Sequence, residues 1–188
     1  MNKLALAALL LIVGCKKAET PPPAAAAPAP GSPEWKVANA RSAAPAQIAM
    51  NATVLDGVVY DSVPGATLAA GDNGWTCYAS DPRTEADDPV CLDEQGMAFE
   101  RAWLAHQTPH LTGMGIAYLL KGGVSPSDTD PFKMAPDSGQ PWIQEPPQIG
   151  IAMPSARSYA GLPTQRRPDG PWVRFAGTPY AYIVIPSR

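Results

Sequence analysis

Apolar residues follow a helical period most clearly in the middle of the chain, over residues 92–107. Four residues fall on one face of that expected helix, at spacings of i, i+3, i+4 and i+7: Phe99, Ala102, Trp103 and His106. Asp93 is well placed as the N-cap, and Pro109 ends the pattern. A shorter helix is expected over residues 44–50, where Pro45 falls in the first turn and its missing N–H is tolerated.

Seven shorter segments are candidate strands: 52–56, 67–70, 75–78, 115–121, 149–154, 172–176 and 181–186. The pattern of most of them is typical of half-buried strands. Asn73 and Gly74 both tolerate positive φ. The sequence therefore predicts a tight turn there, and a hairpin between residues 67–70 and 75–78.

Strands and helices rarely alternate along the chain, which argues against repeated βαβ units. The predicted fold class is α+β, with a mainly antiparallel or mixed sheet, one long and one short helix, and the helices packed on one side. The chain holds 23 Pro and 16 Gly among its 188 residues. Loops should therefore make up much of the fold.

The first residues have the composition of a secretory signal, with Lys3, an uncharged stretch at 4–13 and the small residue Gly14. Ten apolar residues are too few to span a bilayer, which takes about 20. The Ile-Val-Gly-Cys segment at 12–15 resembles the lipobox of bacterial lipoproteins. The resemblance implies that residues 1–14 are removed as a signal peptide and that Cys15 carries acyl chains such as palmitate, which hold the protein to a membrane.

Lys16 follows the cysteine, and a residue other than aspartate at this position resembles the sorting signal of Gram-negative outer-membrane lipoproteins. The resemblance implies the periplasmic face of the outer membrane. Residues 15–33 are rich in Ala and Pro and contain nothing large enough to nucleate a core. They are predicted to be an extended tether. Residues 34–188 then match the size of a single globular domain.

Cys77 and Cys91 are predicted to form a disulfide, because an exported protein enters an oxidising compartment. The bridge would close a loop of about 15 residues and tie the third strand to the start of the long helix. Redox catalysis is not indicated, because the pair lacks the C-x-x-C spacing of exchange-active cysteines.

Several motifs between Asn73 and Pro186 resemble those of a family of uncharacterised bacterial exported proteins. They are Asn73-Gly74-Trp75-Thr76-Cys77, Asp88-Pro89-Val90-Cys91-Leu92-Asp93-Glu94, Asp130-Pro131-Phe132 and Gly177-Thr178-Pro179-Tyr180. The resemblance implies one coherent domain and carries no activity. Members of the family often have histidine where this chain has Gln148 and Tyr182, which implies that any site built on those histidines is altered here.

Two patterns raise the question of a metal. His106 and His110 have the i, i+4 spacing of zinc ligands, but Pro109 lies between them and no third ligand is near. Calcium oxygens could come from an acidic loop containing Asp81, Glu85, Asp87 and Asp88, or from the turn with Asp128 and Asp130, although neither matches an EF-hand. We therefore expect no metal and no cofactor, and interpret the two acidic segments as solvated turns.

The protein is mildly acidic, with a formal net charge of −3 and an isoelectric point of 5.3, and its sequence has no cluster of basic residues. Nucleic acid is therefore not an expected partner. Aromatic residues could form a groove for a glycan or an envelope protein, and Trp142 and Trp172, both next to proline, are expected to be the more exposed tryptophans.

The sequence thus favours a binding or structural module at the cell envelope, with an unknown ligand. The alternative is an envelope hydrolase without a recognisable motif, since the common serine and cysteine nucleophile motifs are absent from the chain. Its hypothetical polar site consists of His110, Asp128, Asp130 and Tyr180.

Overall fold

A computed structural model describes residues 27–84 and 86–187. The predicted signal peptide, Cys15 and the tether as far as residue 26 lie outside the described residues. Three α-helices and one 3-10 helix are present in the described ranges: α1 (Pro33–Arg41), α2 (Ala46–Ala49), α3 (Glu94–Leu104) and η1 (Ala156–Tyr159).

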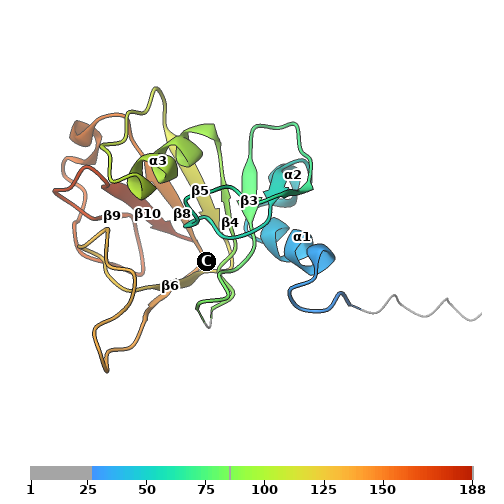
Figure 1. Cartoon of the computed structure of the whole chain (residues 1–188). Helices are drawn as coiled ribbons and strands as arrows, with labels where there is room; N and C mark the ends of the chain where they lie inside the picture. Colours follow the sequence, from blue (N-terminus) through green and yellow to red (C-terminus); the bar gives the residue numbers. More distant parts are fainter. Residues whose placement is uncertain (1–26, 85, 188) are drawn as a thin grey trace, which may run out of the picture.

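Most of the strands form one eight-stranded mixed sheet (Figure 1). Its strands are, in spatial order, β2 (Thr67–Ala69), β1 (Thr53–Leu55), β3 (Thr76–Tyr78), β4 (Val90–Leu92), β5 (Gly115–Leu119), β8 (Gln148–Ala152), β10 (Tyr182–Pro186) and β9 (Trp172–Arg174). The β1 and β3 strands are parallel and all other neighbours in this sheet are antiparallel. A separate antiparallel ribbon joins β6 (Gly123–Ser125) to β7 (Ile143–Glu145). The predicted α+β class with a mixed, mainly antiparallel sheet is confirmed.

The predicted hairpin between the second and third strands is wrong, because β1 lies between β2 and β3 and pairs with both. The turn residues bond to the segment that leads into β1. The backbone N–H of Asp72 donates to the carbonyl of Asn51, and the side chain of Asn73 donates to the carbonyl of Ile48. A central position suits β1, whose Val54 is completely buried.

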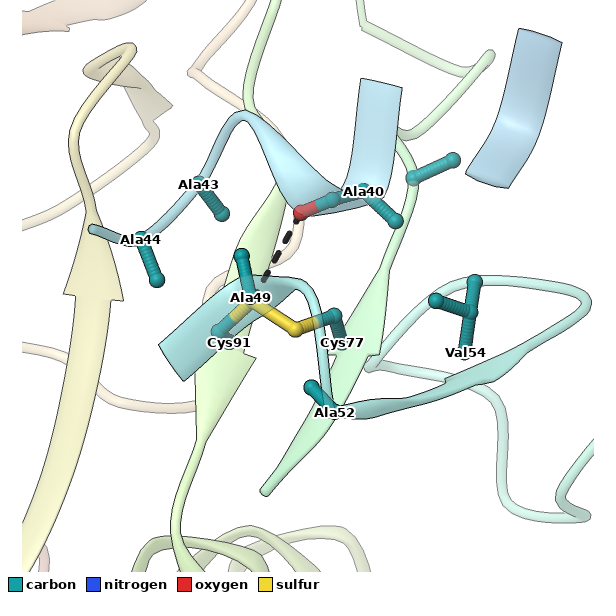
Figure 2. Packing of buried hydrophobic residues seen from close by; sticks show 9 residues of the cluster. Ala40, Ala43, Ala44, Ala49, Ala52, Val54, Cys77 and Cys91 are labelled. Carbon is teal, nitrogen blue, oxygen red and sulfur yellow. Dashed lines mark hydrogen bonds between the residues drawn. A yellow bond between two sulfur atoms is a disulfide. The ribbon is translucent and has the colours of Figure 1, made fainter. Parts of the chain in front are cut away.

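The helices pack on opposite faces of the sheet, which corrects the prediction that they share one side. Cys77 and Cys91 are register partners and therefore point to the same face, and α1 and α2 cover that face with small residues (Figure 2). The next residues along these strands, Tyr78 and Leu92, point to the other face, where α3 crosses β4, β5 and β8 (Figure 1).

Helix α1 was not expected. It begins at Pro33, with Ser32 as N-cap accepting a hydrogen bond from the N–H of Trp35, so the last two residues of the predicted tether belong to it. Its only buried residue is Ala40, which leaves almost no apolar stripe for a sequence pattern to reveal. The short strands β4, β6 and β7 were missed as well. Each has only three residues, and β4 is buried throughout, so it has no alternation.

The predicted N-cap of helix α3 is confirmed, because Asp93 accepts from the N–H of Gly96; the helix itself begins at Glu94, and Leu92, the first residue of the predicted range, belongs to β4. The predicted end at residue 107 is wrong, since the helix stops at Leu104. There His106 takes a positive φ of 54°, and the N–H groups of His106 and Gln107 donate to the carbonyls of Trp103 and Ala102. These two bonds form a Schellman motif, so the helix ends before Pro109 is reached.

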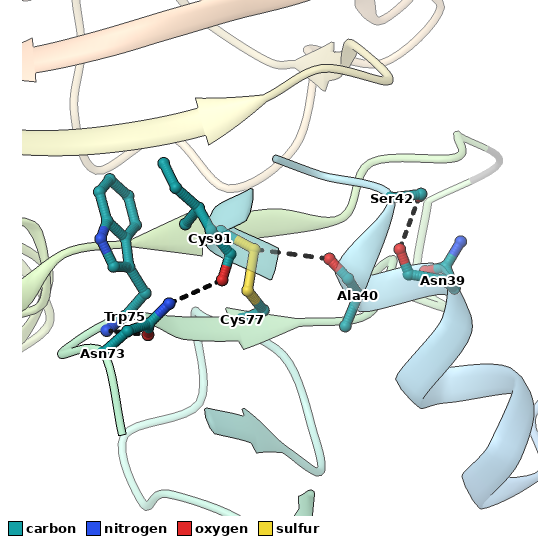
Figure 3. The surroundings of a disulfide bond; sticks show 8 residues. Asn39, Ala40, Ser42, Asn73, Trp75, Cys77 and Cys91 are labelled. Carbon is teal, nitrogen blue, oxygen red and sulfur yellow. Dashed lines mark hydrogen bonds between the residues drawn. A yellow bond between two sulfur atoms is a disulfide. The ribbon is translucent and has the colours of Figure 1, made fainter. Parts of the chain in front are cut away.

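The predicted Cys77–Cys91 disulfide is confirmed, and it joins the neighbouring strands β3 and β4 (Figure 3). Both cysteines are fully buried. The carbonyl oxygen of Ala40 lies 3.5 Å from the sulfur of Cys91, so the end of α1 rests directly on the bridge. The disulfide is therefore the centre of the core on this face.

Candidate ligand cleft

A cleft lies on the α3 face of the sheet and has two parts that share several lining residues. The inner part has a volume of about 120 Å³ and the outer part about 400 Å³. Phe99 and Glu100 of α3, Arg174 of β9 and Tyr182 of β10 line both parts. The two parts are therefore continuous, and the cleft runs from the middle of the sheet towards solvent.

The inner part exists because small residues occupy the sheet positions beneath it. These are Gly115 and Ala117 of β5 and Gly150 and Ala152 of β8, and Gly96 of α3 lies opposite them in the lining. At Gly150 a Cβ atom would stand 3.5 Å from the ring of Tyr182 and 3.6 Å from the Cβ of Ala117, which is ordinary contact distance. A larger side chain at this position would therefore occupy the cavity without first displacing backbone.

Aromatic rings form much of the outer walls: Tyr60, Phe99, Trp103, Trp142, Phe175, Tyr180 and Tyr182. Tyr60 meets Trp103 edge to face at 5.4 Å between ring centroids. Trp142 is half-buried, whereas Trp172 is only 1 % exposed, so the predicted exposure of Trp172 is wrong. The guanidinium of Arg166 lies 5.1 Å from the centre of the Trp172 ring and covers it.

A buried charge cluster lies at the floor. Arg174, 4 % exposed, donates to Glu145 at 2.6 Å and to Asp128 at 2.8 Å, and it also donates to the hydroxyl of Ser125. Arg166 donates two hydrogen bonds to Asp128 and two to Glu145. Two guanidinium groups thus meet two carboxylates, so the cluster has no net charge, and it joins the β6–β7 ribbon to β9.

Glu145 is a poor base in this cluster. Burial alone would raise its pKa, but the charge of Arg174 and the hydrogen bonds from Arg166 and Ser125 outweigh burial and lower the pKa to about 2. The carboxylate therefore stays ionised at every pH where the protein would function.

Three buried polar atoms around this cleft have no hydrogen-bond partner in the described part of the protein: Glu100 Oε2, Gln148 Oε1 and Arg174 Nε. The orientation of Gln148 is fixed, since its Nε2 donates to Glu145 at 2.8 Å and a carboxylate can only accept. Its Oε1 is therefore a fixed acceptor. Buried polar groups are rarely left unpaired, so these three atoms need partners that the chain does not supply, either water or a ligand.

Burial raises the pKa of Glu100 to about 8. Part of the residue remains exposed, but its Oε2 is covered. At neutral pH the carboxyl group is thus mostly protonated and can donate a hydrogen bond. The cleft then offers two donors, Glu100 and Arg174 Nε, and one acceptor, Gln148 Oε1.

Replacing Glu100 with glutamine should remove a pH-dependent loss of stability. Below pH 4.5, the ordinary pKa of Glu, the wild-type carboxyl is protonated in both folded and unfolded states, and the two proteins should be similar. Between pH 4.5 and 8 only the unfolded state ionises, so wild-type stability falls as pH rises. We expect Glu100→Gln to be more stable than wild type by about 2 kcal/mol at pH 8, measured by urea unfolding. An equal difference at pH 4 and pH 8 would contradict a raised pKa.

The structure brings together only part of the predicted polar site. Asp130 and Tyr180 line the outer cleft, and Asp128 lies behind them, bonded to Arg174. His110 is exposed and is not among the lining residues of the cleft. The Asp130 carboxylate accepts from the N–H of Phe132, on whose ring His106 stacks at 4.2 Å.

The acidic loop is held by contacts with neighbouring residues. Asp81 accepts from Arg83, and Asp88 accepts from the backbone N–H of Asp81 and from Thr84. Asp87 pairs with Lys121 at 3.0 Å. Within the described ranges no group of three His, Cys, Asp or Glu side chains is arranged to hold a metal ion.

The residues at the floor were not predicted as a site. The sequence had singled out Gln148 and Tyr182 among the lining residues, as positions of an expected altered site, and both line the inner cleft. Arg174 and Glu145 gave no signal, because they are 29 residues apart and meet only through the fold.

Comparisons with known proteins found no matching family model, no matching curated protein and no matching solved structure. No helix in residues 27–84 and 86–187 has the length and apolar content needed to cross a bilayer.

Proposed function

We propose that this protein is a lipid-anchored binding protein of the bacterial cell envelope, and that the cleft between α3 and the sheet holds a small ligand. One observation carries the proposal, namely the three unpartnered polar atoms at a single aromatic-lined cavity. A volume of about 400 Å³ is within the range of ligand pockets. Apolar walls with a few convergent polar groups are also typical of such pockets.

Binding is better supported than hydrolysis. Ser125 is the hydroxyl at the floor, and a nucleophile needs a base to take its proton. Its carboxylate neighbour Glu145 has a pKa of about 2, and its hydroxyl oxygen already accepts from Arg174. These contacts stabilise a fixed floor and do not activate the serine.

Blocking the inner cleft should strongly weaken the binding of an apolar dye. The neutral dye N-phenyl-1-naphthylamine should bind wild-type protein saturably, with a rise in its fluorescence. Gly150→Val should weaken binding at least tenfold, because its methyl groups fill the inner part. Ile151→Val is the matched control, since Ile151 is the next residue of β8 and faces the opposite side of the sheet. Failure of the wild type to bind the dye, or equal affinity of both variants, would count against the cleft.

The anchor is part of the proposal and rests on the lipobox resemblance and the Ala/Pro-rich segment. Intact-mass analysis of protein isolated from its native host should give a chain that starts at Cys15 and carries acyl mass. The Cys15→Ala variant should lose the acyl mass and leave the membrane fraction. A wild-type chain without acyl mass would contradict the anchor and would leave the cleft unaffected.

A further inference from the structure

The hydrogen-bonding groups of the cleft identify a class of ligand. We infer that the cleft takes an uncharged ligand with an apolar or aromatic body and an amide-type head, whose N–H donates to Gln148 Oε1 and whose carbonyl accepts from Arg174 Nε or Glu100. This inference rests on the proposed function, because it names what the cleft would bind.

Charge balance at the floor argues for a neutral ligand. Arg174 and Arg166 are each bonded to Asp128 and Glu145, so neither guanidinium has an uncompensated charge to offer an anion. An anionic head near Arg174 would also face those two carboxylates. A cationic head at the floor would meet no unneutralised carboxylate, because Asp128 and Glu145 are paired with the two arginines and Glu100, whose pKa is about 8, is mostly neutral at pH 7. A buried charge without a partner costs several kcal/mol.

The direction of each hydrogen bond argues for an amide. Gln148 is 3 % exposed, and its Nε2 bond to Glu145 leaves Oε1 as an acceptor that needs a donor. Arg174 Nε is a donor that needs an acceptor. A ligand head must therefore both donate and accept, and an amide N–H beside a carbonyl does both within one planar group. An aromatic body would lie against Phe99 and Tyr182, which line both parts of the cleft.

Four small probes with the same ring separate these requirements: benzamide, acetophenone, benzoate and benzylamine. Acetophenone has the carbonyl of benzamide but no N–H. Calorimetric titration at pH 7 should show benzamide binding about fivefold more tightly than acetophenone, the effect of one hydrogen bond, and at least tenfold more tightly than either charged probe. In Gln148→Met the preference for benzamide over acetophenone should disappear, while acetophenone itself binds as before.

The ratio of two probes on one variant does not depend on how much that variant is destabilised. Equal binding of benzamide and acetophenone by the wild type, or tighter binding of benzoate, would overturn the amide inference and leave the cleft as a binding site. If the wild type binds none of the four probes but still binds N-phenyl-1-naphthylamine, the amide inference is likewise overturned and the cleft remains a binding site. Failure of both the probes and the dye would overturn the proposed function as well.

Discussion

Arg174→Met should lower the free energy of unfolding by about 3–5 kcal/mol, because it leaves the buried Glu145 and the half-buried Asp128 beside a single remaining guanidinium. Urea unfolding at pH 7 measures the loss. Arg166→Met is the matched control. Arg166 bonds to the same two carboxylates, but its side chain is 25 % exposed against 5 % for Arg174, so water can reach the space that it leaves and the loss of stability should be smaller.

A second variant tests the origin of that loss. In the double variant Arg174→Met/Glu145→Met, the buried carboxylate is removed together with its partner, while Asp128 keeps two hydrogen bonds from Arg166. Replacing both members of a buried pair by apolar residues is often neutral, so much of the stability should return. A double variant as unstable as the sum of its single variants would show that the guanidinium acts mainly through packing.

Removal of the disulfide should lower the free energy of unfolding by about 3 kcal/mol, the chain-entropy estimate for a loop of this length. The free energy of unfolding of the double variant Cys77→Ala/Cys91→Ala is measured by urea unfolding. Both cysteines are fully buried under α1 and α2, so the lost sulfur packing adds to the effect (Figure 2). Wild-type protein should fall to nearly the same stability in reducing buffer. Unchanged stability on reduction would mean that the bridge is absent in solution.

Features set by neighbouring residues could be predicted from the sequence. Asp93 caps α3 through a bond to Gly96 three residues on, and the bridge joins two cysteines 14 residues apart. Short runs of apolar residues indicated the strands β5 and β10. These features depend on local hydrogen bonds and side-chain periodicity, which the sequence displays directly.

Features set by distant residues could not be predicted. The position of β1 between β2 and β3 depends on burial of Val54, and the charge cluster depends on contacts between Arg174, Asp128 and Glu145. An arginine in an alternating strand looks like an exposed residue until its partners are known. The cleft itself is formed by small residues such as Gly150, whose effect is visible only once the strands are placed.

The claim that the cleft is a ligand site is tested most directly by a high-resolution crystal structure of the protein soaked with benzamide. We predict electron density for the ring against Phe99 and Tyr182, with the amide nitrogen within hydrogen-bond distance of Gln148 Oε1. Ordered water alone on Gln148 Oε1, Arg174 Nε and Glu100 Oε2, with no probe in the cleft, would contradict the claim.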